Sequence, residues 1–260
     1  MASGKLKIDL RRERIMELLN QDGLVNVLSL SRELGATPVT IRNDLDCLAQ
    51  EGRLERIKGG AISTGVVTGS WIDPARNVNT CVKEKEAIAR CILSLVHDGD
   101  TLFINSGTTT AVIAKFLATH RRVNVVTNSL AVAQQMAHSV MSRVVLLGGE
   151  LNSDYGFTHG ADAIDQLQRY QPTWSILSVD GIDAQCGITT YHAEEVIIDR
   201  AMMERSHQTI IAADHRKVGW AGFTSICGIN GHTLVTDSGS DPAVLERIEN
   251  AGAKVCVAPL

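Results

Sequence analysis

The feature that most constrains the fold is the segment 34–61, which reads LGATPVTIRNDLDCLAQEGRLERIKGGA. Thr37 is a favourable N-cap, because its hydroxyl can accept a hydrogen bond from a free backbone N–H, and Pro38 suits the first helical position. Gly52 is a typical residue for the end of such a helix. One face of this helix is apolar and carries Ile41, Leu45 and Leu48. The segment therefore predicts a short amphipathic helix with a defined start and stop.

The opposite face of this helix is polar and carries small side chains, as a helix that lies in a DNA major groove requires. Its residues are Val39, Asn43 and Asp46, flanked by Thr40, Arg42 and Cys47. Residues 53–58 then alternate basic or polar with apolar side chains, which predicts a strand, and Gly59-Gly60 turns the chain. A basic hairpin beside a groove helix is a wing that grips phosphate. We therefore expect a winged helix-turn-helix, with an ordinary small helical domain as the alternative.

The segment 37–61 also resembles the signature of the DeoR family of bacterial transcriptional regulators, S-x-x-T-I-R-R-D-L-x-x-L-x-x-x-G-x-x-x-R-x-x-G-G-A. The matching residues are Thr40, Ile41, Arg42, Asp44, Leu45, Leu48, Gly52, Arg56, Gly59, Gly60 and Ala61. Thr37 stands where the family usually has Ser, and Asn43 stands where it usually has Arg. Because residue 43 points away from the core, we expect this difference to alter base preference rather than folding.

The resemblance implies a transcriptional regulator, in most cases a repressor of a carbohydrate-catabolic operon. The contacts to double-stranded operator DNA would come from Thr37, Thr40, Arg42, Asn43, Arg53, Arg56 and Lys58. Of these, Thr40, Arg42 and Asn43 would read bases, with Arg42 the best candidate for guanine. The basic residues of the wing would contact phosphate. Because two half-sites require two recognition helices, we expect a homodimer or homotetramer.

Charge and cysteine content restrict the function less than these motifs do. Residues 1–62 hold ten Lys/Arg and nine Asp/Glu, net +1, and the remainder holds fifteen and twenty, net −5, which gives −4 overall. An acidic body with basic contact points is compatible with DNA binding but does not argue for it. The six cysteines form no C-x-x-C pair, so we expect free thiols in a reducing cytosol and no metal. No apolar targeting segment or membrane-length run occurs, so we expect a cytoplasmic protein without a membrane partner.

The chain divides into a DNA-binding domain at 1–62, a linker at 63–80 and a larger domain at 81–260. Two further helices, 8–20 and 27–34, complete the first domain. In the larger domain apolar strands alternate with helices, which predicts an open, mostly parallel α/β sheet. The expected strands are 101–105, 123–128, 143–148, 175–179, 209–213, 233–236 and 254–258. The expected helices are 83–96, 108–119, 130–137, 193–206 and 242–251.

A candidate ligand site follows the first of these strands. The residues there are Asn105, Ser106, Gly107, Thr108, Thr109 and Thr110. Gly107 allows close approach of the backbone, and free N–H groups at the next helix start, together with hydroxyls, could cradle an anion. A strand-to-helix cap without a ligand is the alternative. The chain contains no G-K-[ST] Walker ending and no G-x-G-x-x-G, so we expect no nucleotide cofactor.

Other strand ends are polar as well, and they extend the resemblance through the second half of the chain. The shared segments are 85–89, 98–101, 106–109, 126–129, 148–149 and 213–214. The sensor domain of the DeoR family is similar to ribose-5-phosphate isomerase and binds phosphorylated sugars. By this resemblance the loop 106–110 would hold the phosphate, and Asn128, Asp180 and Lys217 would belong to the same effector site. The chain has Arg216 where the family often has Ser.

A sugar-phosphate isomerase with an accessory DNA-binding arm is the alternative function. Aldose–ketose isomerisation needs a carboxylate base and a group that polarises the carbonyl. The isomerases carry D-G-A-D-E and then a Gly-rich loop with Lys, whereas residues 180–184 read DGIDA and residues 185–190 contain no Lys. The sequence therefore favours a regulator that has no enzymatic activity.

Overall fold

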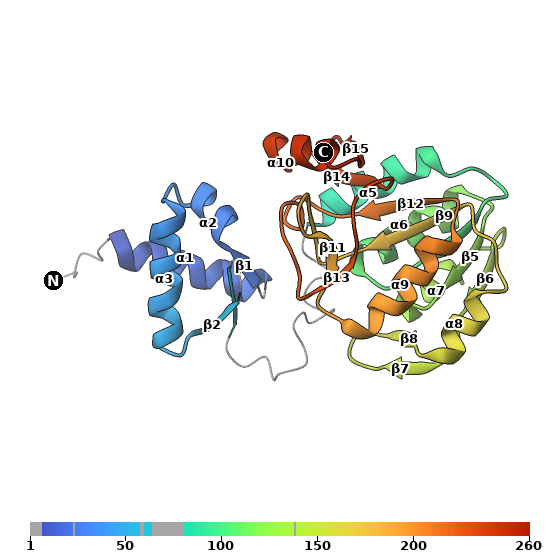
Figure 1. Ribbon diagram of the computed structural model, residues 1–260, viewed down its shortest axis with the longest axis horizontal. Coiled ribbons are helices and arrows are strands. Elements are labelled where there is room, and N and C mark those ends of the chain that lie inside the picture. Colours follow the sequence, from blue (N-terminus) through green and yellow to red (C-terminus); the bar gives the residue numbers. More distant parts are fainter. Residues whose placement is uncertain (1–6, 23, 58–59, 64–80, 138) are drawn as a thin grey trace. The chain divides into compact units, whose positions relative to one another are not determined.

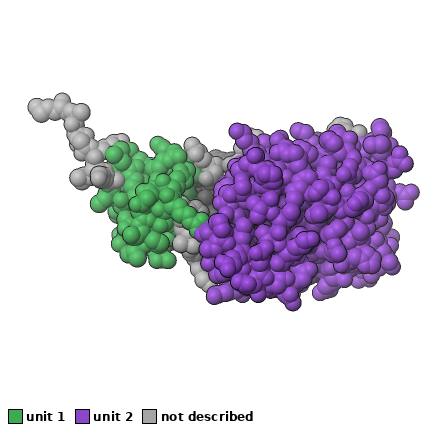
Figure 2. All heavy atoms as spheres, turned by 90° about the horizontal axis from the view of Figure 1, so that it is seen from above, with its two compact units in different colours: residues 1–80 green, residues 81–260 purple. Residues whose placement is uncertain are grey.

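The computed structural model describes residues 7–22, 24–57, 60–63, 81–137 and 139–260 (Figure 1). The chain divides into two compact units, residues 1–80 and 81–260 (Figure 2). Most of the expected linker 63–80, and Lys58 of the expected wing, lie outside the described residues. Among the described residues, no helix is long and apolar enough to cross a membrane.

The first unit combines three helices with a small antiparallel sheet. Its elements are α1 (Lys7–Asp22), β1 (Leu24–Asn26), α2 (Val27–Glu33), α3 (Pro38–Gln50), β2 (Leu54–Ile57) and β3 (Gly60–Ser63). The strand order is β1-β3-β2, so the hairpin β2–β3 extends from a strand that lies between α1 and α2 in sequence. A Cβ atom on Gly60 would lie 2.0 Å from the carbonyl oxygen of Val25, so this close approach of β3 to β1 requires glycine.

The helix α3 forms as its sequence predicts. Thr37 caps it, because its Oγ1 accepts a hydrogen bond from the backbone N–H of Thr40 at 3.2 Å, and Pro38 is its first residue. Gly52 follows it with a φ of +69°, the left-handed conformation that ends many helices. The apolar face packs into one cluster with α1, α2 and the sheet, and its fully buried members are Ile41, Leu45 and Leu48.

The second unit is built on a seven-stranded parallel sheet of order β15-β14-β12-β9-β4-β5-β6. These strands are β4 (Thr101–Ile104), β5 (Asn124–Thr127), β6 (Arg143–Leu146), β9 (Trp174–Ser178), β12 (Gln208–Ala212), β14 (Thr233–Asp237) and β15 (Lys254–Ala258). Their side chains are mostly buried, since helices cover both faces. The predicted strands therefore occur where the sequence places them, with ends that differ by one or two residues.

Two hydrophobic clusters fill the space between the sheet and its helices (Figure 1). One cluster packs α5 (Val82–Leu95), α6 (Thr108–His120) and α7 (Leu130–Met136) on one face. The other packs α8 (Ala161–Leu167), α9 (Ala193–Arg205) and α10 (Pro242–Asn250) on the opposite face. The domain thus has three layers, α/β/α, and the expected fold class of a winged helix-turn-helix followed by a mostly parallel α/β domain is confirmed.

Short elements between the main strands were not predicted. They are the hairpin β7 (Glu150–Asn152) and β8 (Phe157–His159), the helix α8, and a second sheet of β10 (Gly181–Asp183), β11 (Gly187–Thr190) and β13 (Thr224–Cys227). Unlike the strands of the main sheet, these short strands contain no continuous apolar run that would reveal them. The second sheet lies in the connections that follow β9 and β12, next to the carboxyl ends of those strands.

The strand order reverses between β4 and β9. From β4 the chain proceeds through α6 to β5 and β6 on one side, and from β9 it proceeds through α9 to β12, β14 and β15 on the other. Because α6 and α9 cover opposite faces, the connections leave neighbouring strands in opposite directions. Ligands of open α/β sheets bind in the crevice at the carboxyl ends of the strands at such a switch point.

Candidate functional sites

The exposed face of α3 is the first candidate site. Arg42 and Asn43 are exposed on this helix, while Thr37 and Thr40 stand at its N-terminus. The hydroxyl oxygens of the two threonines lie 2.9 Å apart. The two threonines therefore lie together at the start of the helix, and Asn43 follows Thr40 one turn later. Short polar side chains of this kind suit the edge of a base pair.

The wing is fixed to this helix by Arg56. Its Nε donates a hydrogen bond to Oδ1 of Asp46 on α3 at 2.7 Å, and its Nη1 donates to the carbonyl oxygen of Gly60 on β3. One guanidinium thus connects α3, β2 and β3. Arg53, by contrast, is exposed and pairs with Glu51 at 3.4 Å. Arg56 therefore holds the angle between the wing and the recognition helix, in addition to any contact it makes outside the protein.

The other face of α3 is anchored to α1 by a buried carboxylate. Asp44 is 3% exposed, and its two oxygens accept hydrogen bonds from Nε of Arg11 at 2.5 Å and Nε of Arg12 at 3.1 Å. In the sequence, Asp44 is only a match to the family signature. The structure gives it a physical role, because it orients the recognition helix on the rest of the unit.

The loop between β4 and α6 is the second candidate site and lies at the switch point. A Cβ atom on Gly107 would lie 2.6 Å from Cβ of Ser178 on β9, so this residue must be glycine for the loop to pack there. The hydroxyl oxygen of Thr110 lies 3.0 Å from the carbonyl oxygen of Asn105 and 2.9 Å from that of Gly107, so its one proton closes the loop from inside. Ser106 and Thr108 are half-buried, so the loop presents backbone N–H groups and hydroxyls at the start of α6.

Thr109 follows at the second position of α6. It is 0% exposed, and its hydroxyl oxygen has no hydrogen-bond partner among the described residues. Asn128, which follows β5, is also 0% exposed; its Nδ2 donates to the carbonyl oxygen of Thr158, while its Oδ1 has no partner there. Buried polar atoms are nearly always hydrogen-bonded. These two atoms lie at the carboxyl ends of neighbouring strands, the edge at which open α/β sheets bind their ligands.

Asn105 connects this loop to the neighbouring strand and to α9. Its Nδ2 donates to the carbonyl oxygen of Ser178 at 2.9 Å and to the carboxylate of Asp199, and its Oδ1 accepts from the backbone N–H of Ser178. All polar atoms of this side chain are thus engaged within the protein. Asn105 therefore links the loop to β9 and α9 inside the domain, and its amide is not at the surface.

Positive charge reaches the site from the end of β12. Arg216 Nε lies 3.1 Å from Oδ1 of the buried Asp214, and Lys217 Nζ donates to the carbonyl oxygen of Val179 at 2.6 Å. Burial opposes ionisation of Asp214, but Arg216 and Lys217 outweigh it, and the pKa of Asp214 falls to about 2. Lys85 of α5 faces the same carboxylate; burial lowers the pKa of Lys85 to about 8, and Asp214 opposes this. The family resemblance included Lys85 and Asp214, but no role was assigned to either.

Three carboxyl groups interact electrostatically near this loop, those of Asp180, Glu195 and Asp199. Asp180 follows β9 and is half-buried; its Oδ2 accepts hydrogen bonds from Thr190 Oγ1 at 3.0 Å and from the backbone N–H of Tyr191 at 2.9 Å. Glu195 and Asp199 come from α9 and are buried. Burial raises the pKa of Asp199 to about 7, against the hydrogen bond from Asn105 and with the added effect of Asp180. The described residues contain no group of three or more His, Cys, Asp or Glu that could hold a metal ion.

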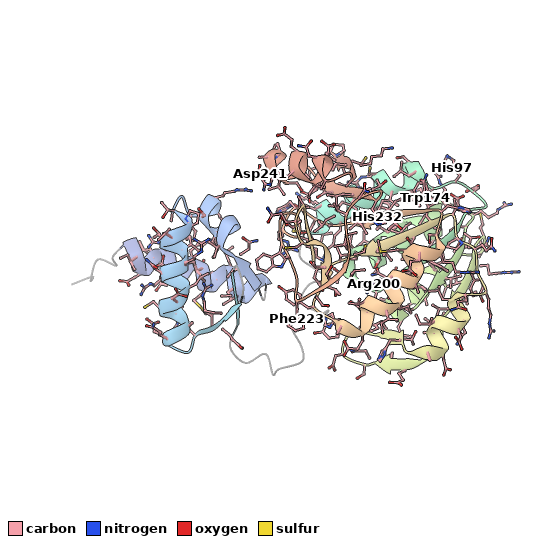
Figure 3. All side chains as sticks on the ribbon, in the orientation of Figure 1. His97, Trp174, Arg200, Phe223, His232 and Asp241 are labelled. Atoms are coloured by element: carbon pink, nitrogen blue, oxygen red, sulfur yellow. The ribbon has the colours of Figure 1, made fainter. Side chains whose placement is uncertain are left out.

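Glu195 and Asp199 are not among the site residues that the sequence predicts. One signal could have found them, because acidic residues at i and i+4 stand on a helix face that otherwise carries Ile198 and Met202. Helix α9 is held in place by Arg200, labelled in Figure 3, whose guanidinium donates to the carbonyl oxygens of Ser225 and Ile226 on β13. The second sheet thus fixes the helix that brings both acids to the site.

Two family descriptions match the chain. Residues 11–65 match the DeoR-like helix-turn-helix domain, and residues 80–238 match the DeoR C terminal sensor domain. The second match alone spans more than half of the chain. Both candidate sites lie within these segments.

Curated relatives agree with these matches. The chain is 34% identical over 210 residues to the glycerol-3-phosphate regulon repressor of Escherichia coli (strain K12), covering 80% of this chain and 82% of the relative. It is 30% identical to the HTH-type transcriptional repressor GlcR of Bacillus subtilis (strain 168), covering 94% and 93%. It is also 30% identical to a putative aga operon transcriptional repressor of Escherichia coli O157:H7, covering 94% and 92%.

Among solved structures, the ribose 5 phosphate isomerase A of Neisseria gonorrhoeae overlaps this chain with a TM-score of 0.38 and 13% identity. The overlap covers 51% of this chain and 52% of the isomerase.

Proposed function

The chain belongs to the DeoR family of DNA-binding transcriptional regulators, and from this we propose that it represses a carbohydrate-catabolic operon under the control of a phosphorylated sugar. It is a regulator rather than an enzyme, as its relatives are named repressors. The proposal also assigns it operator DNA as a partner and the cytoplasm as its location. The observation that supports a polar effector is a pair of buried atoms, Thr109 Oγ1 and Asn128 Oδ1, that have no hydrogen-bond partner within the described parts of the chain.

We assign operator contacts to the two elements that Arg56 holds together. Arg42 and Asn43 would face the base edges, because they are exposed on α3, and the half-buried Thr40 would join them at the helix start. Phosphate contacts would come from the wing and from the helix start, through Arg53, Arg56, Lys58 and Thr37. Since Arg56 also bonds to Asp46, its contribution includes the position of the wing.

The phosphate of the effector would sit on the loop 106–110. The N-terminus of α6 supplies backbone N–H groups and the positive end of a helix of 13 residues. Gly107 permits close approach, and Thr108 adds a hydroxyl. The sugar would extend over the end of β9 towards Asp180 and Lys217, with Asn128 on the side of β5. Carboxylate and amide groups of this kind bind sugar hydroxyls.

Regulation would follow from linkage. An effector changes affinity for DNA only by the difference between its affinities for the two arrangements of the protein. Two recognition helices are required for two half-sites, so the acting form would be a homodimer or homotetramer. In this scheme the bound sugar phosphate favours an arrangement whose recognition helices no longer match the spacing of the operator.

A thermal-shift screen of the full chain tests the effector. The panel contains sugar phosphates, glycerol 3-phosphate and the corresponding unphosphorylated compounds. A ligand present at about 100 times its Kd should stabilise the protein by about 2.7 kcal/mol, which is readily measured. The expected result is a rise with one phosphorylated compound that its unphosphorylated form does not produce.

Two variants of the same helix make this result specific. Thr108→Ala should abolish the shift, because it removes a hydroxyl at the start of α6. Thr119→Ala is the matched control, since Thr119 lies in the last turn of α6 and bonds to the carbonyl oxygen of Phe116. Equal shifts for phosphorylated and free sugars, or for the two variants, would exclude the loop as the phosphate site.

A further inference from the structure

Glu195 has an unusual hydrogen-bonding position. It lies in the first turn of α9 and is 9% exposed. The hydrogen bond described for its carboxyl group involves Thr190, whose Oγ1 lies 3.2 Å from Oε2 of Glu195. Thr190 is itself buried at the end of β11. An ionised carboxylate at this buried position would need hydrogen-bond donors to offset the cost of its burial.

The hydroxyl of Thr190 lies between two carboxyl groups. It is 3.2 Å from Glu195 and 3.0 Å from Oδ2 of Asp180, and its oxygen also accepts a hydrogen bond from the backbone N–H of His192. A threonine hydroxyl has one proton, so it can donate to only one of the two carboxyl groups. If both acids were ionised, one carboxylate oxygen would face a lone pair of Thr190 in a buried environment.

A proton on Glu195 resolves this conflict. The protonated carboxyl group of Glu195 donates to Thr190, and Thr190 donates to Asp180. Asp180 is the more exposed of the two acids and also accepts from the backbone N–H of Tyr191, so the proton of Thr190 is assigned to the bond with Asp180. In this arrangement every group of the chain Glu195–Thr190–Asp180 has a partner of the correct kind.

The charges around Glu195 act in the same direction. Burial raises the pKa of Glu195 well above its ordinary range, and the negative charges of Asp199 and Asp180 raise it further. The hydrogen bond from Thr190 and the positive charge of Lys217, from the segment after β12, oppose this effect. The facing groups therefore come from α9 itself, from the end of β9 and from the end of β12. The single cation does not compensate for the two acids and burial.

We propose that Glu195 is a positioning residue whose protonated carboxyl group, through Thr190, fixes the carboxylate of Asp180 for a ligand hydroxyl. The ligand part of this statement rests on the proposed function, in which Asp180 lines the sugar. Fixing one oxygen of Asp180 leaves the other to accept from a hydroxyl. Loss of the proton from Glu195 places a second negative charge beside Asp180 and releases Thr190 from its fixed orientation, so the effector site is linked to pH.

The proposal is tested on the ligand-free full chain, so that its failure is distinct from failure of the sugar-phosphate assignment. Asp and Glu carboxyl carbons are labelled with ¹³C, and their NMR signals are followed against pH. The Glu195 signal is identified by its loss in Glu195→Gln, or in Glu195→Asp if the first variant does not fold. Glu195 should titrate well above the ordinary value of about 4.3 for a glutamate. Titration at the ordinary value would overturn the proposal.

The connection through Thr190 has its own signature. In the unmodified chain the carboxyl carbon of Asp180 should show a second inflection at the pH where Glu195 loses its proton. This inflection should persist in Thr190→Ser, which keeps the hydroxyl, and should disappear in Thr190→Val and in Glu195→Gln. An Asp180 signal that does not respond to the titration of Glu195 would show that the two groups are not connected.

Discussion

The carboxylate of Asp44 accepts a hydrogen bond from Nε of Arg11 at 2.5 Å, with the side chains 4% and 19% exposed. Arg12 supplies a second cation to the same carboxylate at 3.1 Å. Consecutive residues of α1 therefore hold α3 through one acidic group on its inner face. The recognition surface on the outer face of α3 depends on this anchor for its orientation.

Asp44→Asn should destabilise the DNA-binding unit by about 2 to 3 kcal/mol, because hydrogen bonds between charged groups are lost in a mostly buried position. Urea unfolding followed by circular dichroism measures the change. Glu17→Gln is the matched control, since Glu17 pairs with Arg14 at 3.0 Å on the exposed surface. Such a surface pair contributes less than about 1 kcal/mol. Equal effects of the two substitutions would show that Asp44 is not an anchor.

The two arginines of the wing segment should behave differently towards DNA. Arg53→Ala and Arg56→Ala each remove one positive charge, and each should flatten the dependence of log K on log[salt] by about 1 if that residue contacts phosphate. Arg56→Ala also removes the bond to Asp46, so its affinity should fall further at every salt concentration. Fluorescence anisotropy with a labelled operator measures both effects. Identical losses for the two variants would mean that the bond to Asp46 does not position the wing.

Asn43 should determine part of the operator preference. It is exposed on α3, where the family usually has Arg, and Arg favours guanine through two hydrogen bonds. Asn43→Arg should therefore shift the preferred sequence, by about 1 to 3 kcal/mol per base pair read. Selection from a randomised DNA library, performed with both proteins, gives the two preferences. An unchanged preference would place residue 43 outside the groove.

The sequence predicts those parts of the fold that depend on local patterns. Thr37, Pro38 and Gly52 specify the bounds of α3 through capping and φ, and each acts within one turn of the helix. The parallel strands are equally readable, because burial on both faces produces continuous apolar runs. The order of those strands is set by packing between distant segments, so the switch point between β4 and β9 was visible only in the structure.

The candidate effector site divides in the same way. Gly107 and Thr108 stand beside each other in a recognisable strand-to-helix loop, so the sequence identifies them. Glu195 comes from another helix, 15 positions after Asp180, and only the pairing of β10 with β11 brings both acids to the hydroxyl of Thr190. Asn105 is the opposite case. Its position in the sequence predicts a ligand contact, but in the structure its amide is hydrogen-bonded to Ser178 and Asp199.

Asp214 should stabilise the sensor domain in a manner that depends on pH. Burial opposes its ionisation, but Arg216, Lys217 and Lys85 lower its pKa from 3.8 to about 2. A carboxyl group whose pKa is lower in the folded chain stabilises the folded state at every pH above its pKa in the unfolded chain. This stabilisation is lost as pH falls from about 4 towards 2.

Asp214→Asn should therefore cost about 2 to 3 kcal/mol at pH 7, since a shift of nearly two pKa units corresponds to that free energy. The cost should decrease when urea unfolding is repeated at pH 3, because the unmodified chain then begins to lose the contribution of Asp214. Asp162→Asn, on the exposed start of α8, is the control and should change stability little at either pH. A cost that is the same at pH 7 and pH 3 would show that the ionised form of Asp214 does not stabilise the domain.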